Sequence, residues 1–162
     1  MNKILIIGLN GAGKSTLAKI LGEKLNIEVV HIDKYYFRSN WQAVSKQEWQ
    51  ETIDQILLKK TWIIDGTYMS SFDKRVELAD TIIYLNFNKF FCFYRILKRA
   101  LNRSQPFDKI EGNLNKIDYG LIKKIIKYPK NEILKKVESF KNSKKVLVFK
   151  NSKEVKNWLQ TV

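Results

Sequence analysis

The chain has 162 residues, enough for one domain that buries a hydrophobic core without disulfides or bound metals. Apolar residues make up 44% of it, and no window approaches the roughly 18 consecutive apolar residues of a membrane span. The single cysteine, Cys92, cannot form an intramolecular disulfide and lies in an apolar run, which predicts a buried thiol in a reducing cytoplasm. A strand is predicted to begin at Lys3, which leaves no room for a signal peptide.

The net charge of +14 bears on the partners that the protein could have. Of the 30 basic residues only 5 are arginines, and residues 121–162 carry 12 lysines against 3 glutamates. Many of these lysines are interleaved with apolar residues along predicted helices, which is typical of a solvated helical face. Weak, nonspecific adhesion to nucleic acid is the alternative that this charge leaves open.

Short apolar runs of strand length alternate along the chain with longer segments of helical period. This alternation predicts a parallel sheet flanked by helices. The predicted strands are Lys3–Ile7, Glu28–Ile32, Thr61–Asp65, Thr81–Leu85 and Lys145–Phe149. The predicted helices are Lys14–Leu25, Lys46–Lys60, Lys89–Asn102, Tyr119–Ile126, Asn131–Asn142 and Lys153–Leu159. No linker, repeat or low-complexity tract separates them, so residues 1–162 are expected to form a single domain.

The first strand and the first helix are joined by Gly8-Leu9-Asn10-Gly11-Ala12-Gly13-Lys14-Ser15, a complete match to G-x-x-x-x-G-K-[ST]. At a strand-to-helix turn, such a loop surrounds a phosphate chain with backbone N–H groups and with the positive end of the helix. Lys14 would then reach the β- and γ-phosphates of a nucleotide, and the Ser15 hydroxyl would ligate Mg²⁺. A glycine loop that matches by chance is the alternative.

The second predicted strand leads into His31-Ile32-Asp33. Ligands of open α/β sheets bind at the carboxyl ends of the strands, so the Asp33 carboxylate is expected beside the γ-phosphate. There it would accept the proton of an acceptor hydroxyl or orient that hydroxyl for in-line transfer. The alternative for Asp33 is a helix N-cap or turn residue. His31 is expected to be a packed or hydrogen-bonded strand residue rather than a catalyst.

The third predicted strand closes with Ile63-Ile64-Asp65-Gly66. An apolar run that ends in an aspartate predicts a carboxylate that holds Mg²⁺ directly or through water. Gly66 would let the chain turn sharply beneath the phosphates. A strand-terminating Asp-Gly turn with no metal is the alternative.

Several aromatic residues lie between the second and third strands, namely Tyr35, Tyr36, Phe37, Trp41 and Trp49. The consecutive residues Tyr35, Tyr36 and Phe37 cannot all face inward from one element. At least one ring is therefore available to stack on a planar acceptor such as a nucleobase. Core packing is the alternative for each ring.

Three of the five arginines, Arg95, Arg99 and Arg103, recur at i, i+4 and i+8 of one predicted helix. Like charges at this spacing destabilise a bare helix, whereas guanidinium groups suit multidentate recognition of an anion. The row is therefore predicted to neutralise charge that develops on a triphosphate, with a merely solubilising face as the alternative. The polar segment 104–118 follows and is predicted to be a mobile lid.

These motifs together resemble those of the adenylate-kinase-like P-loop kinases and, over nearly the whole chain, those of the bacterial DNA topology modulation proteins. The likeness rests on the Gly8–Ser15 loop, His31-Ile32-Asp33 with its aromatic tail to Trp41, Trp62–Tyr68, Asp73-Lys74-Arg75, Ala79–Ile83, Cys92 with Arg95 and Arg99, and Ser152–Val155. It implies the P-loop NTPase α/β fold, a three-layer sandwich around a five-stranded parallel sheet of nucleoside/nucleotide-kinase type with a small helical lid. It also implies ATP binding.

The chain departs from these family patterns at two places. Adenylate kinases typically have an arginine shortly after the Asp-Gly of the third strand, which holds the acceptor phosphate. Here Thr67–Met69 occupies that stretch, and Arg75 is the candidate substitute. The lid of the topology modulation family often begins with Arg-Pro and carries another arginine, whereas this chain has Gln105-Pro106 and Lys116.

The resulting hypothesis is a cytoplasmic phosphotransferase, monomeric or homodimeric, that moves the γ-phosphoryl group of Mg-ATP to a small acceptor, a nucleoside or nucleotide. An ATP-regulated DNA-associated protein is the alternative, and an NTPase without an acceptor ranks last. The expected nucleotide-binding residues are Gly8, Asn10, Gly11, Ala12, Gly13, Lys14, Ser15, Thr16, Arg95 and Arg99, and the expected acceptor-side residues are Asp33, Tyr36, Arg38, Trp41, Asp65, Gly66, Tyr68 and Arg75. Lys14, Asp33, Arg95 and Arg99 are the expected catalytic residues, and Ser15 and Asp65 the expected Mg²⁺ ligands.

Overall fold

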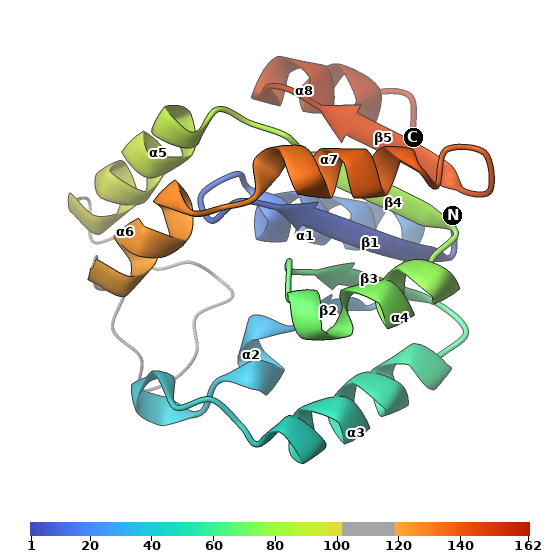
Figure 1. Ribbon diagram of the computed structural model, residues 1–162. Helices are drawn as coiled ribbons and strands as arrows, with labels where there is room; N and C mark the ends of the chain where they lie inside the picture. The colour runs from blue at the N-terminus through green and yellow to red at the C-terminus, as the bar shows by residue number, and fades with distance from the viewer. Residues whose placement is uncertain (102–118) are drawn as a thin grey trace.

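The structure, a computed structural model, describes residues 1–101 and 119–162 (Figure 1). Its five strands are β1 (Lys3–Gly8), β2 (Val29–His31), β3 (Trp62–Asp65), β4 (Thr81–Leu85) and β5 (Lys145–Phe149). They form one sheet in the order β2-β3-β1-β4-β5, and every neighbouring pair is parallel. The predicted strands are confirmed, and each observed boundary lies within one residue of the predicted one.

The strands are apolar runs because both faces of the sheet are covered. Along β1, Leu5 and Ile7 belong to one hydrophobic cluster, whereas Ile4 and Ile6 belong to the other. The first cluster is completed by α3 (Lys46–Leu58), α4 (Phe72–Leu78) and α7 (Lys130–Glu138). The second is completed by α1 (Lys14–Leu25), α5 (Lys89–Leu101), α6 (Tyr119–Ile126) and α8 (Ser152–Leu159). The parallel sheet flanked by helices that the alternating pattern predicted is therefore confirmed, as is the three-layer arrangement that the resemblance implied.

The strand order determines where a ligand can bind. From β1 the chain builds the β2–β3 half of the sheet on one side and the β4–β5 half on the other. The direction of winding reverses at β1, and such a reversal opens a crevice at the carboxyl ends of the strands. The register pairs Gly8 with Leu85, and Asp65 with both Ile6 and His31, so these residues lie at one sheet edge. Figure 1 shows α2 (Asp33–Tyr36), α5 and α6 on this side of the sheet.

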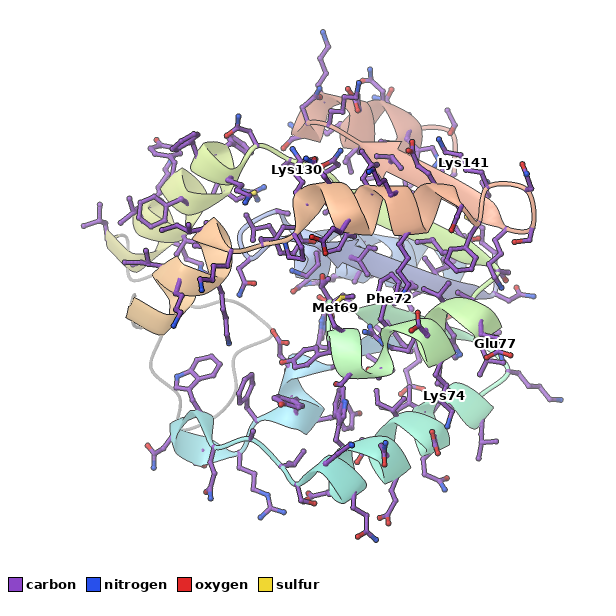
Figure 2. The ribbon with its side chains drawn as sticks, in the orientation of Figure 1. Met69, Phe72, Lys74, Glu77, Lys130 and Lys141 are labelled. Atoms are coloured by element: carbon purple, nitrogen blue, oxygen red, sulfur yellow. The ribbon has the colours of Figure 1, made fainter. Side chains whose placement is uncertain are left out.

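Some short helices were not predicted. These are α2, α4 and the 3-10 turns η1 (Ser39–Trp41) and η2 (Met69–Ser71). Phe72 of α4 is fully buried and points toward the sheet, whereas Glu77 lies on the exposed side of this helix (Figure 2). The predicted helices all have counterparts, although α7 ends at Glu138 rather than Asn142 because the chain enters consecutive turns there. The predicted end of α5 at Asn102 and the predicted lid at 104–118 lie outside the described residues.

A membrane-spanning helix is not found in the described part of the chain. None of its helices combines the length and the apolar content that crossing a bilayer requires.

Candidate active site

The glycine loop packs directly against the backbone of α5. Gly11 and Gly13 have φ angles of 82° and 95°, a backbone region that residues other than glycine rarely adopt. A Cβ atom on Gly11 would lie 2.4 Å from the carbonyl oxygen of Cys92 in α5. Glycine at this position is therefore required by both the backbone conformation and the close approach of α5.

The first turn of α1 has no capping side chain. Its N-cap residue is Gly13, and no acidic residue lies in the first turn. The amide hydrogens at the start of a helix need acceptors, and an anion supplies them where no side chain does. The loop and this helix start therefore fit the phosphate chain of a nucleotide. Lys14 donates to the Leu9 carbonyl at 3.3 Å, Ser15 is half-buried, and Asn10 and Thr16 are exposed.

Thr67 joins the loop after β3 to the start of the glycine loop. Its hydroxyl accepts from the Gly8 amide at 3.0 Å and donates to the Gly8 carbonyl at 2.9 Å. The preceding residue, Gly66, has a φ of 133°, and a Cβ there would lie 2.5 Å from Ile32. Thr67 was not among the predicted site residues. A hydroxyl residue directly after the strand-ending Asp-Gly is the sequence signal that could have identified it.

Arg95 extends from α5 to the glycine loop. Its guanidinium donates to the Ala12 carbonyl at 3.2 Å, and its nitrogens lie 3.2 and 3.3 Å from where a Cβ on Gly13 would be. The same guanidinium lies 5.7 Å from the centre of the Phe91 ring. Arg99 follows one turn later and is exposed, and Arg103 lies outside the described residues. The structure thus brings Arg95 of the predicted arginine row to the loop.

Asp65 and His31 form a pair at the ends of two neighbouring strands. Asp65 is 5% exposed, and its Oδ1 lies 2.8 Å from Nδ1 of His31. The prediction of a hydrogen-bonded strand histidine is therefore confirmed. Across residues 1–101 and 119–162, His, Cys, Asp and Glu form no group of three or more that could hold a metal. A Mg²⁺ ion held by Asp65 and Ser15 would thus take its other oxygen ligands from phosphates and water, as this ion commonly does.

Asp33 is held by a phenol. It is the first residue of α2 and is exposed, and its Oδ1 accepts from the Tyr68 hydroxyl at 2.7 Å. Burial, together with the charge of Asp33, raises the pKa of Tyr68, so the phenol remains protonated and donates. The N-cap of α2 is Ile32, so the alternative of an N-capping Asp33 is wrong. This hydrogen bond orients a carboxylate whose surface is open to a ligand.

Five rings form an aromatic cluster beside Asp33: Tyr36, Phe37, Trp41, Trp49 and Tyr68. The centre of the Tyr36 ring lies 4.6 Å from that of Tyr68 and 4.9 Å from that of Trp49. Phe37 and Trp41 are 5.3 Å apart. Trp49 is buried in the core, whereas Trp41 is 47% exposed, so the cluster runs from the interior to the surface. The cluster thus contains both a core ring and an exposed ring, and stacking of a ring on an acceptor stays a prediction.

Arg75 is directed to backbone carbonyls in the interior of the protein. Its side chain is fully buried, and it donates to the carbonyls of Ser71, Gly66 and Tyr68 at 3.2, 2.7 and 2.6 Å. Burial lowers the pKa of the guanidinium to about 10, which leaves it protonated at neutral pH. The expectation that Arg75 holds an acceptor phosphate conflicts with this geometry. Its guanidinium instead holds the loop that carries Thr67 and Tyr68.

Arg38 is also engaged by protein groups. One of its terminal nitrogens donates to both carboxylate oxygens of Glu48, at 2.9 and 2.8 Å. Both side chains are well exposed, and the pair ties the segment after α2 to the first turn of α3. Arg38 was predicted on the acceptor side, and the structure directs its guanidinium to this carboxylate.

Comparison with known proteins finds sequence similarity to nucleotide kinases. The model of a family described as the ATPase family associated with various cellular activities (AAA) matches residues 4–65. A cytidylate kinase of Clostridium perfringens is 35% identical over 72 residues, which are 43% of this chain and 31% of that protein. A putative adenylate kinase of Thermococcus kodakarensis is 27% identical over 118 residues, 68% of this chain and 64% of that protein. The chain thus aligns with less than a third of the cytidylate kinase.

Two solved structures match over almost the whole chain. The shikimate kinase of Bacteroides thetaiotaomicron has a TM-score of 0.53 and 18% identity, and the match covers 98% of this chain and 94% of that one. The deoxyadenosine kinase of M. mycoides also has a TM-score of 0.53, with 16% identity and coverage of 99% and 100%. With the parallel five-stranded sheet and the glycine loop, these matches establish that the fold is the α/β fold of the P-loop kinases.

The role of Arg75 can be tested by its replacement with methionine, which keeps much of the side-chain volume. Two buried carbonyls and one partly buried carbonyl would lose their donors, so we expect Arg75→Met to lower the free energy of unfolding by about 3 kcal/mol. The matched control is Arg38→Met, which breaks an exposed ion pair and is expected to change it by about 1 kcal/mol or less. Urea denaturation followed by tryptophan fluorescence measures both. Equal effects of the two substitutions would contradict the structural role of Arg75.

Proposed function

We propose that the protein is an ATP-dependent phosphotransferase that moves the γ-phosphoryl group of Mg-ATP to a hydroxyl of a small acceptor of the nucleoside or nucleotide class. One observation carries the proposal. The glycine loop and the Asp33 carboxylate belong to the same sheet edge, and the segment Gly66–Tyr68 contacts both, through Thr67 and Tyr68. A phosphate cradle and a carboxylate that is open to a hydroxyl are the two parts that phosphoryl transfer requires.

The donor side would be formed by the glycine loop and α5. The uncapped amides of α1 and the Lys14 ammonium would hold the phosphate chain, after Lys14 exchanges the Leu9 carbonyl for a phosphate oxygen. Ser15 and Asp65 would hold Mg²⁺, which neutralises phosphate charge when it is bound. Arg95, already at the loop, would stabilise charge that develops on the transferred group.

The acceptor side would be formed by Asp33 and the aromatic cluster. Asp33 would orient the acceptor hydroxyl and accept its proton as the new bond from oxygen to the γ-phosphorus forms. The bond from the γ-phosphorus to the bridging oxygen breaks, and ADP leaves. Tyr68 keeps the carboxylate in place, and the rings of Tyr36 and Trp41 are candidates for contact with a planar part of the acceptor.

The comparisons support this proposal through the names of the similar proteins. Cytidylate kinase and adenylate kinase are named for nucleotide acceptors, and the deoxyadenosine kinase structure is described with the products dCMP and dCDP bound. None of the relatives reported above is named a topology modulation protein, so that resemblance stays a prediction. The same holds for the cytoplasmic location, the oligomeric state and the DNA-associated alternative.

Activity can be tested with purified protein, Mg-ATP and a panel of nucleosides and nucleoside monophosphates. We expect ADP to form in an acceptor-dependent manner. Lys14→Ala should lower kcat/KM by about 100-fold or more, because the ammonium group that stabilises the negative charge of the transition state is lost. The readout is coupled ADP release. Lys19→Ala, on the same helix and outside the loop, is the control and should retain activity. ATP binding without acceptor-dependent ADP from any member of the panel would refute the phosphotransferase.

The role of Asp33 predicts a different signature. Asp33→Asn keeps the size of the side chain and removes the proton acceptor, so kcat should fall about 100-fold or more while the Kd for ATP changes little. Tyr68→Phe removes the hydroxyl that holds Asp33 and should produce a smaller loss of kcat. Steady-state kinetics and calorimetric ATP titration separate the two effects. Weakened ATP binding in Asp33→Asn with unchanged kcat would contradict an acceptor-side role.

A further inference from the structure

The charged groups near Asp33 indicate whether the acceptor carries a phosphate of its own. A kinase that phosphorylates a nucleoside monophosphate must hold a second anion, the phosphate of its acceptor. Guanidinium groups are suited to this because they bind phosphate in a bidentate manner. Two arginines belong to the segments that carry the aromatic cluster, Arg38 after α2 and Arg75 in α4.

Arg75 is committed to the backbone. It is fully buried and donates to three carbonyl oxygens of the segment that precedes it. Redirecting these donors to an acceptor phosphate would leave the Gly66 and Tyr68 carbonyls without their donors and would release the Tyr68 segment. Unpaired buried carbonyls are unfavourable, so the arginine is held where it is.

Arg38 is committed to a carboxylate. Both carboxylate oxygens of Glu48 accept from one guanidinium nitrogen of Arg38, and the carboxylate compensates the positive charge of this guanidinium. The partner is part of α3, whose first turn is stabilised by the Ser45 cap on the Glu48 amide. An acceptor phosphate would have to displace Glu48 and would leave this carboxylate beside the bound dianion.

Within residues 1–101 and 119–162, the carboxylate expected beside the acceptor hydroxyl opposes a second phosphate, and a lysine lies at the outer part of the aromatic cluster. The exposed Asp33 carboxylate follows the end of β2 and would repel an acceptor dianion beside it. The Lys124 ammonium of α6 lies 5.9 Å from the centre of the Phe37 ring, at the outer part of the aromatic cluster. The rings of Phe37 and Tyr68, whose centres are 6.5 Å apart, lie between this lysine and Asp33.

We infer that the acceptor is an uncharged alcohol with a planar ring, a nucleoside rather than a nucleoside monophosphate. The inference rests on the proposed function and deepens it. Asp33 would bind the hydroxyl, the rings of the aromatic cluster would contact the planar part, and neither step needs a cation from Arg38 or Arg75.

The test compares each nucleoside with its own 5′-monophosphate as acceptor for the wild-type protein. We expect kcat/KM to favour the nucleoside by about 100-fold or more, since an unpaired buried charge is strongly disfavoured. Quenching of tryptophan fluorescence, titrated in the presence of a nonhydrolysable ATP analogue, supplies a binding readout that does not require turnover. A kcat/KM for the monophosphate that equals or exceeds the kcat/KM for its nucleoside would overturn the inference and leave the proposed phosphotransferase function intact. If no acceptor of either kind is used, the proposed function fails, and the inference fails with it.

A second experiment tests directly whether the ion pair with Glu48 keeps Arg38 from binding an acceptor phosphate. Glu48→Gln keeps the shape of the side chain and removes the negative charge that faces the Arg38 guanidinium, so use of the monophosphate relative to the nucleoside should rise about tenfold. Glu51→Gln is the matched control, because it removes the same charge from α3 at a residue that hydrogen-bonds Gln47 instead. A rise in Glu48→Gln alone supports the inference. Equal ratios in the two variants would overturn the argument that Arg38 is withheld from an acceptor phosphate.

Discussion

The rest of the structure depends on the close contact between the glycine loop and α5. Gly11 lies so near the Cys92 carbonyl that a Cβ atom would approach it to 2.4 Å. The backbone of α5 therefore packs directly against the loop, and α5 also positions Arg95 to donate to the Ala12 carbonyl. Thr67 fastens the other end of the loop by bonding both backbone groups of Gly8. The shape of the loop is thus determined by α5 and by the segment after β3 as much as by its own glycines.

The parts of the fold that could be predicted from the sequence are those with long, regular patterns. The central strands are buried on both faces, so they appear as continuous apolar runs, and these runs predicted all five strands to within one residue. The loop was predicted because glycine is required where φ is positive or where another backbone lies close. The edge location of Asp33 and Asp65 followed from the parallel sheet, since aligned strands end at the same edge.

Contacts made by short elements could not be predicted in the same way. With four and seven residues, α2 and α4 have too few turns to show a helical period. Arg75 donates to carbonyls nine, seven and four residues before it, and η2 and α4 bring these groups together in the folded chain. The sequence displays the charge of Arg75 but not the carbonyls that use it. For the same reason, Tyr68 was predicted near the acceptor, whereas its hydrogen bond to Asp33 was not.

Some of the lysines have a structural role at the ends of helices. Several lysines donate to carbonyls at the ends of helices: Lys24 at the end of α8, Lys89 at the end of α6 and Lys144 at the end of α4. The last carbonyls of a helix lack partners within it and carry partial negative charge, so an ammonium group stabilises them. These contacts use part of the positive charge without any nucleic acid. Lys24 and Lys144 each donate to two carbonyl oxygens, so one ammonium group can satisfy more than one of these carbonyls. Part of the lysine excess therefore stabilises the ends of helices in the folded chain.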